Sequence, residues 1–216
     1  MLKYRPFEMH CHTRHSDGTF LVPQLIESVA AYGYAGLALT DHNAVTGLLE
    51  VTEELQRKNN CLVLPGIEWT TFYGHLLVIG CDRFVDWRFV TPDTIDEALQ
   101  EIRAAGGIAG VAHPCEVGSP LMCGCNWEFR VKRWDLMDYV EIWSGPDPHA
   151  SAKNGLAMPW YDALLNQGYH LAISAGRDWH GPDKPGQIPL LTATYLGIDG
   201  DVTIENAKAA IRAGRT

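Results

Sequence analysis

Short apolar runs alternate along the chain with longer segments in which apolar residues recur at helical spacing. Eight of the short runs predict β-strands, at residues 7–9, 35–39, 61–65, 76–79, 108–111, 139–142, 170–174 and 190–195. Runs of this length, separated by polar segments, are typical of strands buried in the core of a domain. The pattern therefore predicts eight strands with helices between them.

Three segments between or after these runs show clear helix signals. Residues 23–30 begin with Pro23 and place leucine, isoleucine, valine and alanine on one face. Residues 93–104 have Ile95, Leu99 and Ile102 on one face and are followed by two glycines that favour a helix end. Residues 203–213 form a similar stripe at the end of the chain. Helices therefore alternate with the strands.

This alternation predicts βαβ units, a parallel sheet and an α/β barrel. In such barrels the catalytic groups lie where strands end and loops begin. Polar residues follow that rule here: His10, Asp41, His42, Glu68, His113, Glu141, Asp178 and His180 all lie in or just after a predicted strand. We therefore expect these side chains to gather at one end of a barrel.

Composition limits the classes of protein that the chain can represent. Its 216 residues, 46% of them apolar, suit one domain spanning 1–216 with a sizeable core. The formal charge of −9 makes nucleic acid an unlikely partner, although bound metals would let an acidic protein accept an anionic substrate. The sequence shows no signal peptide or membrane span, and its six cysteines suggest reduced thiols rather than a disulfide framework. These features predict a cytoplasmic protein with no membrane partner.

Two short motifs are the first candidates for metal binding. His10-Cys11-His12 places two imidazoles two residues apart, on the same side of a strand. Asp178-Trp179-His180 repeats this spacing near the other end of the chain. A single pair of this kind is more often a pair of surface histidines, but two pairs, each after an apolar strand, favour ligation.

Further ligand-type residues lie near the other strand ends, at Asp17, His42, Glu68, His75 and His113. Each has an ordinary alternative: Asp17 as a turn residue, Asp41 as a helix cap, His75 as a core histidine, Glu68 as half of an ion pair. Together they place imidazoles and carboxylates at successive strand ends. This donor set suits Zn²⁺, Mn²⁺ or Fe²⁺, and a shared carboxylate can hold two ions roughly 3.5–4 Å apart.

Six ordered segments resemble the PHP (polymerase and histidinol phosphatase) metallohydrolases over nearly the whole chain. They are His10-Cys11-His12-Thr13 with Ser16-Asp17-Gly18, Thr40-Asp41-His42-Asn43, Gly66-Ile67-Glu68, Gly74-His75, Ala112-His113-Pro114 and Asp178-Trp179-His180-Gly181. The segments 140–145 and 213–216 are similar to the branch that includes carbaryl-type ester and carbamate hydrolases. The resemblance implies a distorted (β/α)7 barrel with two or three divalent metals.

The resemblance also implies how the ligands are divided. The first metal is assigned His10, His12, Glu68 and Asp178. The second shares Glu68 and adds His75 and His113, and the third takes Asp17, His42 and His180. Glu141 matches a family position and is expected to orient a loop or a ligand histidine.

Several residues are weaker candidates. Arg177 is expected to clamp a phosphate oxygen or, equally, to form a salt bridge with Asp41 or Glu141. Arg14, His15 and Lys184 lie in loops close to ligands and are more simply solvated loop residues. Cys115, Cys123 and Cys125 with Glu116 fit no structural zinc pattern and are more simply inert thiols. The segment 116–134 is long and irregular, which suggests a lid or a pocket rim.

The sequence therefore predicts a metal-dependent phosphoesterase, in which metal-bound hydroxide attacks a small phosphate mono- or diester. Glu68, Asp178, His180 and Arg177 are the expected catalytic residues. The same site would also support hydrolysis of a carboxylic ester or carbamate. A different class, a metal-binding structural or regulatory module without catalysis, also remains open. The substrate, the physiological metal and the oligomeric state are not fixed by the sequence.

Overall fold

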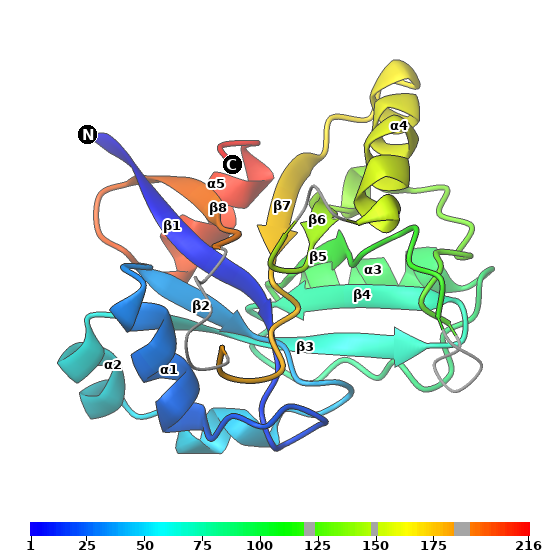
Figure 1. Ribbon diagram of the computed structural model, residues 1–216. Coiled ribbons are helices and arrows are strands. Elements are labelled where there is room, and N and C mark those ends of the chain that lie inside the picture. Colours follow the sequence, from blue (N-terminus) through cyan, green and yellow to red (C-terminus); the bar gives the residue numbers. More distant parts are fainter. Residues whose placement is uncertain (119–123, 148–150, 184–190) are drawn as a thin grey trace.

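The computed structural model describes residues 1–118, 124–147, 151–183 and 191–216. Its elements alternate as the sequence predicts (Figure 1). The strands are β1 (Leu2–Cys11), β2 (Gly36–Leu39), β3 (Leu62–Thr71), β4 (Gly74–Ile79), β5 (Ile108–Val111), β6 (Tyr139–Ser144), β7 (Ala172–Gly176) and β8 (Thr194–Asp199). The helices are α1 (Val22–Ala31), α2 (Glu53–Asn59), α3 (Ile95–Ala104), α4 (Ala152–Asn166) and α5 (Ile204–Arg212), with 3₁₀ turns η1 (Thr46–Glu50) and η2 (Trp134–Leu136).

The strands form one curved sheet in the order β7-β6-β5-β4-β3-β2-β1-β8. The sheet nearly closes on itself, because the segment after β7 pairs in parallel with β1 through Cys11 and Trp179. The helices lie outside the curve, with α1 beside β2, α2 beside β3 and α4 beside β6 (Figure 1). The predicted α/β class and the distorted, barrel-like sheet are confirmed.

The sheet is mixed, so the expectation of an all-parallel sheet is wrong. Strand β4 runs antiparallel to both β3 and β5, and β8 runs antiparallel to β1. Only two residues separate β3 from β4, and a link this short can form a hairpin but not a crossover. The described residues contain eight strands, one more than a (β/α)7 barrel has.

Several strands extend beyond the apolar runs that predicted them. β1 continues through His10, and β3 continues through Glu68, so both side chains lie within strands rather than after them. β8 spans Thr194–Asp199, later than the predicted 190–195. The shifts at β1 and β3 share a cause, since the strands continue into polar residues that the barrel buries.

The predicted helices are found with small changes at their ends. α1 has Pro23 in its first turn, and Thr203 caps α5 by accepting the backbone N–H of Asn206. α3 ends before Gly106, which has a φ of 72° that few other residues adopt. None of the helices in the described ranges has the length and apolar character to cross a membrane.

The two faces of β3 and β4 have different roles. Leu64 of β3 and Leu77 of β4 lie in one buried cluster, whereas Ile67, Trp69 and Val78 pack in another cluster together with α3. Alternate residues of a strand face opposite sides. Glu68 therefore faces away from the cluster that contains Ile67 and Trp69, toward the end of the barrel where the polar residues gather.

Candidate metal centre

Glu68 lies at the centre of a buried cluster of histidines and carboxylates. Its Oε2 atom is 3.1 Å from His10 Nε2, 3.4 Å from His12 Nε2 and 2.9 Å from His42 Nδ1. Its Oε1 atom is 2.9 Å from His75 Nδ1 and 3.1 Å from His113 Nε2. The two oxygens of one carboxylate thus face two different sets of imidazoles, which is the arrangement that a carboxylate bridging two metals requires.

The second short motif meets the first at this cluster. Asp178 Oδ1 lies 3.1 Å from His12 Nε2 and 3.4 Å from His10 Nε2. The backbone brings them together, because His12 N–H donates to Trp179 O and Trp179 N–H donates to His10 O. Residues 166 positions apart in the chain therefore become neighbours.

A third group lies at the more exposed edge of the cluster. His180 Nε2 is 3.2 Å from Asp17 Oδ1, and His42 Nε2 is 3.6 Å from the same oxygen. His12 completes this group, since its ligand atom lies within 4.8 Å of the others. The side chain of Asp17 is 57% exposed, so solvent reaches this edge directly.

Further contacts orient the histidines. His10 Nδ1 lies 3.1 Å from Glu141 Oε1, which leaves His10 Nε2 facing Glu68 and Asp178. His42 Nδ1 contacts Thr70 Oγ1 at 2.5 Å. A carboxylate behind a histidine is the usual arrangement around metal-ligating imidazoles, because it fixes the tautomer and the ring. Glu141 also accepts the backbone N–H of His113, so it supports two candidate ligands.

The pKa values follow from burial and the density of charge. Burial would raise the pKa of the Glu68 carboxyl, but the nearby histidines outweigh burial and hold that pKa well below its usual range. Burial would lower the pKa of His10, but Glu68 and Glu141 outweigh burial and raise that pKa well above its usual range. In the metal-free protein the cluster therefore binds protons that a metal ion would displace.

Buried nitrogen and oxygen atoms without hydrogen-bond partners indicate that these histidines and carboxylates fit divalent metals. His10 Nε2 and Glu68 Oε2 are buried and form no hydrogen bond, although they lie 3.1 Å apart. Buried polar atoms rarely stay unpaired, and several of them converging on one point indicate a ligand. Imidazole nitrogens and carboxylate oxygens are ligands for Zn²⁺, Mn²⁺ and Fe²⁺.

Two of the candidate ligands have strained backbones. Asp178 has a φ of 51° and His113 a φ of 24°, in the left-handed region that favours glycine. Each such residue costs on the order of 1–3 kcal/mol, and residues like these cluster at functional sites. Strain at two candidate ligands indicates that the fold holds their side chains in required positions.

All nine predicted ligand positions thus converge, and Asp17 lies close enough to His42 and His180 to join them as a candidate ligand. Asp41 does not cap a helix. Its carboxylate accepts hydrogen bonds from the backbone and hydroxyl of Thr13 and from Ser16 Oγ. It therefore holds the loop that follows β1 and carries Asp17.

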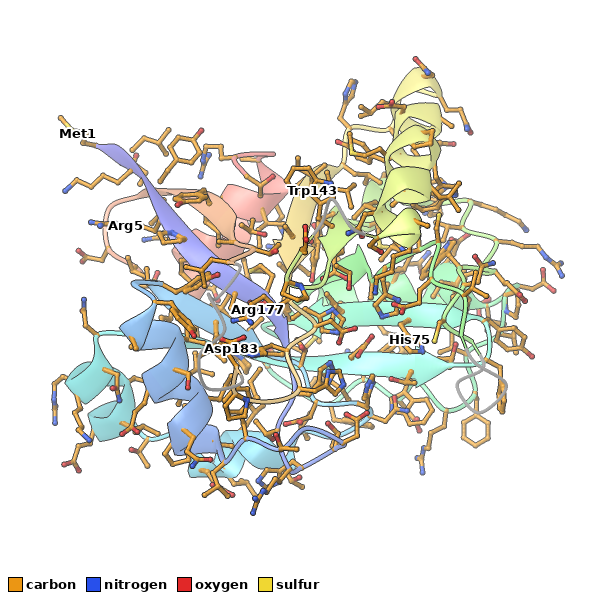
Figure 2. The ribbon with its side chains drawn as sticks, in the orientation of Figure 1. Met1, Arg5, His75, Trp143, Arg177 and Asp183 are labelled. Carbon is orange, nitrogen blue, oxygen red and sulfur yellow. The ribbon has the colours of Figure 1, made fainter. Side chains whose placement is uncertain are left out.

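Arg177 is placed differently from either expectation. Its guanidinium pairs with Asp183 at 2.5 Å and lies 4.0 Å above the Trp179 ring, so a salt bridge to Asp41 or Glu141 is not formed. Figure 2 shows Arg177 beside Asp183, with His75 farther along the site. Tyr32 OH, at the end of α1, donates to the same Asp183 carboxylate at 2.6 Å. Arg177 therefore fastens the loop that carries Asp178 and His180.

The weaker candidates lie at the periphery or outside the described residues. Arg14 donates to Thr19 O, and His15 contacts Thr46 and Glu50, so both have partners within loops. Lys184 and Cys123 lie outside the described residues. Cys115 bridges to Asn126 through the backbone, and the groups that could hold a metal among the described residues include no cysteine.

Lys153 and Glu8, two charged residues near the cluster, were not predicted as site residues, and Glu116 was considered only together with the cysteines. Glu116 forms a possible metal group with His113 and Asp178, and Lys153 of α4 reaches Glu116 at 2.6 Å. Glu8 is fully buried, and its Oε1 accepts the backbone N–H groups of His10 and Arg177. Glu8 continues the two-residue spacing of His10 and His12, and that signal could have identified it.

Comparison with known proteins tests the predicted family. Residues 8–108 match the family model described as the PHP domain. This match agrees with the predicted resemblance to the PHP family over that part of the chain. Over 79 residues, 35% of this chain, the sequence is 34% identical to a 3',5'-nucleoside bisphosphate phosphatase from Chromobacterium violaceum, of which the match covers 27%.

Solved structures show the same fold. A two-domain protein from Bacteroides vulgatus, described as containing a predicted PHP-like metal-dependent phosphoesterase, aligns with a TM-score of 0.72 at 17% identity, covering 99% of this chain and 64% of that one. The lesion-specific endonuclease EndoQ from Pyrococcus furiosus aligns with a TM-score of 0.56 at 13% identity, covering 98% of this chain and 56% of that one. The chain thus spans less than two thirds of each of these relatives.

These relatives also bear on the narrower expectations. None of the three is named for hydrolysis of a carboxylic ester or carbamate, so the resemblance to the carbaryl-type branch gains no support from them. One of them is an endonuclease, so nucleic acid is not excluded as a partner, and the expectation that it is an unlikely one stays a prediction.

Proposed function

We propose that this protein is a metal-dependent phosphoesterase that hydrolyses a small phosphate ester, with a phosphomonoester as the preferred substrate. The observation that carries the proposal is the division of the Glu68 carboxylate between two sets of histidines. The name of the phosphatase relative from Chromobacterium violaceum supports the substrate class. The ester and carbamate alternative has no comparable support.

The metals would be held as the family resemblance implies. His10, His12, Glu68 and Asp178 would hold the first, Glu68, His75 and His113 the second, and Asp17, His42 and His180 the third. Bound divalent ions supply hydroxide near neutral pH and neutralise charge on phosphate oxygens. Without them, Glu68, Asp178 and Asp17 would repel a phosphate group, and this repulsion argues that an anionic substrate needs the metals.

The protein's own residues would orient this chemistry. Glu141 holds His10 and the backbone of His113, Thr70 holds His42, and Arg177 fastens the loop that carries Asp178 and His180. We assign the phosphate contact to Lys153 rather than to Arg177. The Arg177 guanidinium is buried against Asp183 and Trp179, whereas Lys153 brings a cation to Glu116 beside His113.

The test is a substrate panel of phosphomonoesters, linear and cyclic phosphodiesters and aryl carboxylic esters, assayed with Mn²⁺, Zn²⁺ and Fe²⁺ supplied separately. Glu68→Gln should abolish turnover of the phosphomonoester and lower the metal content while the fold survives. His170→Gln is the matched control, because His170 is an exposed histidine outside the cluster. Normal hydrolysis and normal metal content in Glu68→Gln would overturn the proposal.

The same preparation separates catalysis from a structural role for the metals. Circular dichroism should show an intact fold in both variants, and thermal unfolding should be measured with and without metal. If the wild type hydrolyses nothing in the panel and Glu68→Gln only lowers the melting temperature, the metals contribute folding free energy alone. That result would favour the structural module.

A further inference from the structure

A cavity of about 410 Å³ lies at the end of the barrel opposite the metal cluster. Arg5 of β1, Leu62 at the start of β3 and Ala35 just before β2 are in its wall. These three strands are parallel, and their other ends carry candidate metal ligands such as His10 and Glu68. In Figure 2, Arg5 lies on β1 well away from His75. The cavity is therefore separate from the proposed active site.

Two unpaired arginines share this cavity. Arg5 and Arg57 both line it, both are exposed, and neither forms a hydrogen bond or ion pair through its side chain with any residue that the structure describes. Other arginines of this chain pair with aspartates, namely Arg88, Arg103, Arg130, Arg133, Arg177 and Arg212. In a chain with 26 acidic and 17 basic residues, two neighbouring cations without a carboxylate need another explanation.

The acidic residues nearest in sequence do not neutralise Arg57. Glu53 and Glu54 lie one turn earlier on α2, at the spacing where helical ion pairs form. Among the described residues, neither of them nor any other carboxylate pairs with Arg57, and no Asp or Glu lines the cavity. The two guanidinium groups therefore repel each other without compensation, and a bound anion would relieve that repulsion.

The other polar groups of the wall are suited to donate hydrogen bonds. The side-chain oxygen of Gln56 accepts the backbone N–H of Val63 at 2.8 Å, which leaves the NH₂ group of Gln56 as a donor. The backbone carbonyls of Gln56 and Arg57 accept the N–H groups of Cys61 and Asn60. Donors and positive charge therefore dominate the polar part of the wall.

We propose that this cavity is a second binding site, which takes an organic phosphate with a dianionic head group and a small apolar body. A guanidinium group presents parallel N–H donors that match two phosphate oxygens, and two arginines match two negative charges. Ala35, Leu62 and Val202 provide apolar wall for the body of the molecule. The volume of about 410 Å³ suits a small molecule, since ligand pockets span about 300–1,000 Å³.

This site goes beyond the proposed phosphoesterase activity. None of the nine candidate metal ligands lines the cavity, so the site is assigned binding and not hydrolysis. The two ends of the barrel would hold phosphate by different means, through metal ions at one end and through guanidinium groups at the other. The second site therefore does not depend on the metals.

The experiment uses phenylphosphonate as the probe, because its P–C bond is not hydrolysed by a phosphoesterase. Benzenesulfonate is the matched probe with a single negative charge. Both are titrated at about pH 8 into the ¹⁵N-labelled full chain, and the backbone amide resonances are followed by NMR. Phenylphosphonate should shift the amides of Arg57, Asn60 and Leu62 to saturation and should bind about tenfold more tightly than benzenesulfonate. Binding at the metal centre would instead shift the amides around His10 and His12.

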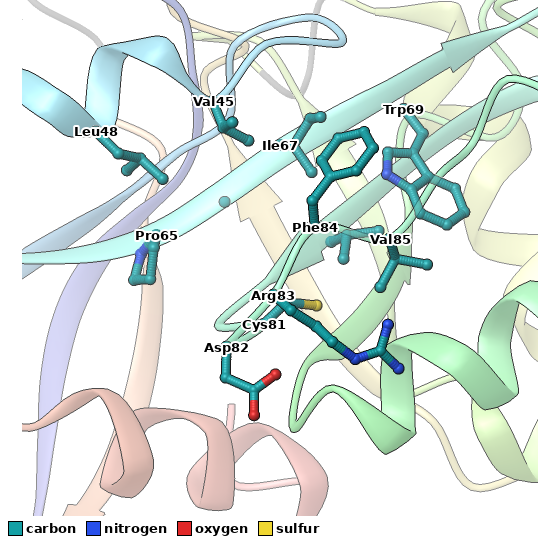
Figure 3. A pocket seen from close by; sticks show the side chains of 12 residues that line it. Val45, Leu48, Pro65, Ile67, Trp69, Cys81, Asp82, Arg83, Phe84 and Val85 are labelled. Carbon is teal, nitrogen blue, oxygen red and sulfur yellow. The ribbon is translucent and has the colours of Figure 1, made fainter.

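Substitution of each arginine tests its role. Arg5→Gln and Arg57→Gln should each weaken phenylphosphonate about tenfold, the factor expected for one lost charge-assisted hydrogen bond, and the double variant should not bind it. Arg83→Gln is the matched control, because it removes the same charge from an exposed arginine. Arg83 lines a different, mostly apolar cavity beside β3 (Figure 3). Thermal unfolding checks that all variants fold.

Several outcomes would overturn the inference. The absence of saturable shifts at these amides, or equal affinity in the wild type and both single variants, would show that the arginines hold no anion. Equal weakening in Arg83→Gln would show that only the net charge acts. Equal affinity for benzenesulfonate, or tighter binding of the dicarboxylate phthalate, would refute a site for a phosphate dianion. The shifts at Arg57, Asn60 and Leu62 require no turnover, so failure of the phosphoesterase proposal would not be mistaken for failure of this one.

Discussion

Two motifs with the same spacing meet at the metal cluster, but the fold holds them in different ways. His10 and His12 lie at the end of a long strand with side chains that are 0% exposed. Asp178 and His180 lie in the loop after β7, with side chains that are 21% and 37% exposed and a strained backbone at Asp178. The first pair is fixed by a ladder of backbone hydrogen bonds, whereas the second depends on a few specific contacts.

The difference teaches that identical spacing does not imply equal roles. The strand pair contacts Glu68 directly and belongs to the most buried part of the cluster. His180 faces Asp17 at the exposed edge. We therefore expect the strand pair, together with Asp178, to determine whether the inner metal binds, and His180 to adjust an outer site that solvent reaches.

The largest expected effect is a difference between His10→Asn and His180→Asn. His10 touches Glu68 and Asp178, so its loss should lower kcat/KM by more than about 100-fold, beyond the 10–100-fold typical of residues behind a ligand. His180→Asn should cost only about tenfold, at the lower end of that range. Steady-state kinetics and elemental analysis of bound metal check both variants. Equal losses in the two would contradict the difference between strand and loop.

The next largest effect concerns Glu141 and Thr70, which contact the candidate ligands His10 and His42. Glu141→Gln removes the charge behind His10 and should cost about 10–100-fold in activity or metal affinity. Thr70→Val removes the hydroxyl behind His42, a half-buried ligand of the outer group, and should cost less. Titration of the metal-free protein with Zn²⁺ measures both. A larger loss in Thr70→Val would place the important site at the exposed edge.

Most of the features compared above could be predicted from the sequence, and there is a physical reason why the others could not. The order of strands and helices follows from periodicity, and the nine candidate ligand positions follow from motif spacing together with the family resemblance. The reversal of β4 does not, because apolar runs indicate a strand but not its direction. The partner of Arg177 was also missed, because Asp183 lies six residues away in a loop whose path no local pattern determines.

The contact between Glu116 and Lys153 could not be predicted from the sequence, because it too depends on the path of the folded chain. Glu116 follows His113 by three residues, but Lys153 lies on α4, and only the folded chain brings it to Glu116. Glu8 could have been predicted as a site residue, since it precedes His10 by two residues in the same strand. A polar residue within a predicted apolar strand is a signal of the same kind as the two histidines that follow it.

Glu8 joins the two motifs and gives the third prediction. Its carboxylate accepts the backbone N–H of His10 in the strand and of Arg177 at the start of the loop. Burial raises the pKa of Glu8 from 4.5 to about 8. The folded chain therefore keeps a proton that the unfolded chain releases, and the contribution of Glu8 to stability falls as the pH rises from 4.5 toward 8.

The variant Glu8→Gln isolates this contribution. It keeps an oxygen for the two N–H groups but cannot lose a proton, so it should lack the decline of up to about 1.4 kcal/mol per pH unit. Urea unfolding of metal-free wild type and variant at pH 5, 6.5 and 8 measures the difference. The variant should gain stability relative to the wild type as the pH rises. Parallel curves would show that Glu8 keeps an ordinary pKa in the fold.

The smallest expected effect tests how the loop pair is held. Tyr32 OH donates to Asp183 Oδ2 at 2.6 Å, and Asp183 in turn holds Arg177, so Tyr32→Phe removes one contact from the chain that fastens Asp178. The free energy of unfolding should fall by about 1 kcal/mol, the usual contribution of one hydrogen bond. Tyr34→Phe is the matched control, because Tyr34 OH donates to Thr192 O and does not contact Asp183. Metal affinity should weaken by no more than about fivefold in Tyr32→Phe, the factor that 1 kcal/mol allows, and should not change in Tyr34→Phe. Isothermal titration with Zn²⁺ measures the affinities, and an equal change in both variants would mean that the loop pair is positioned by its backbone alone.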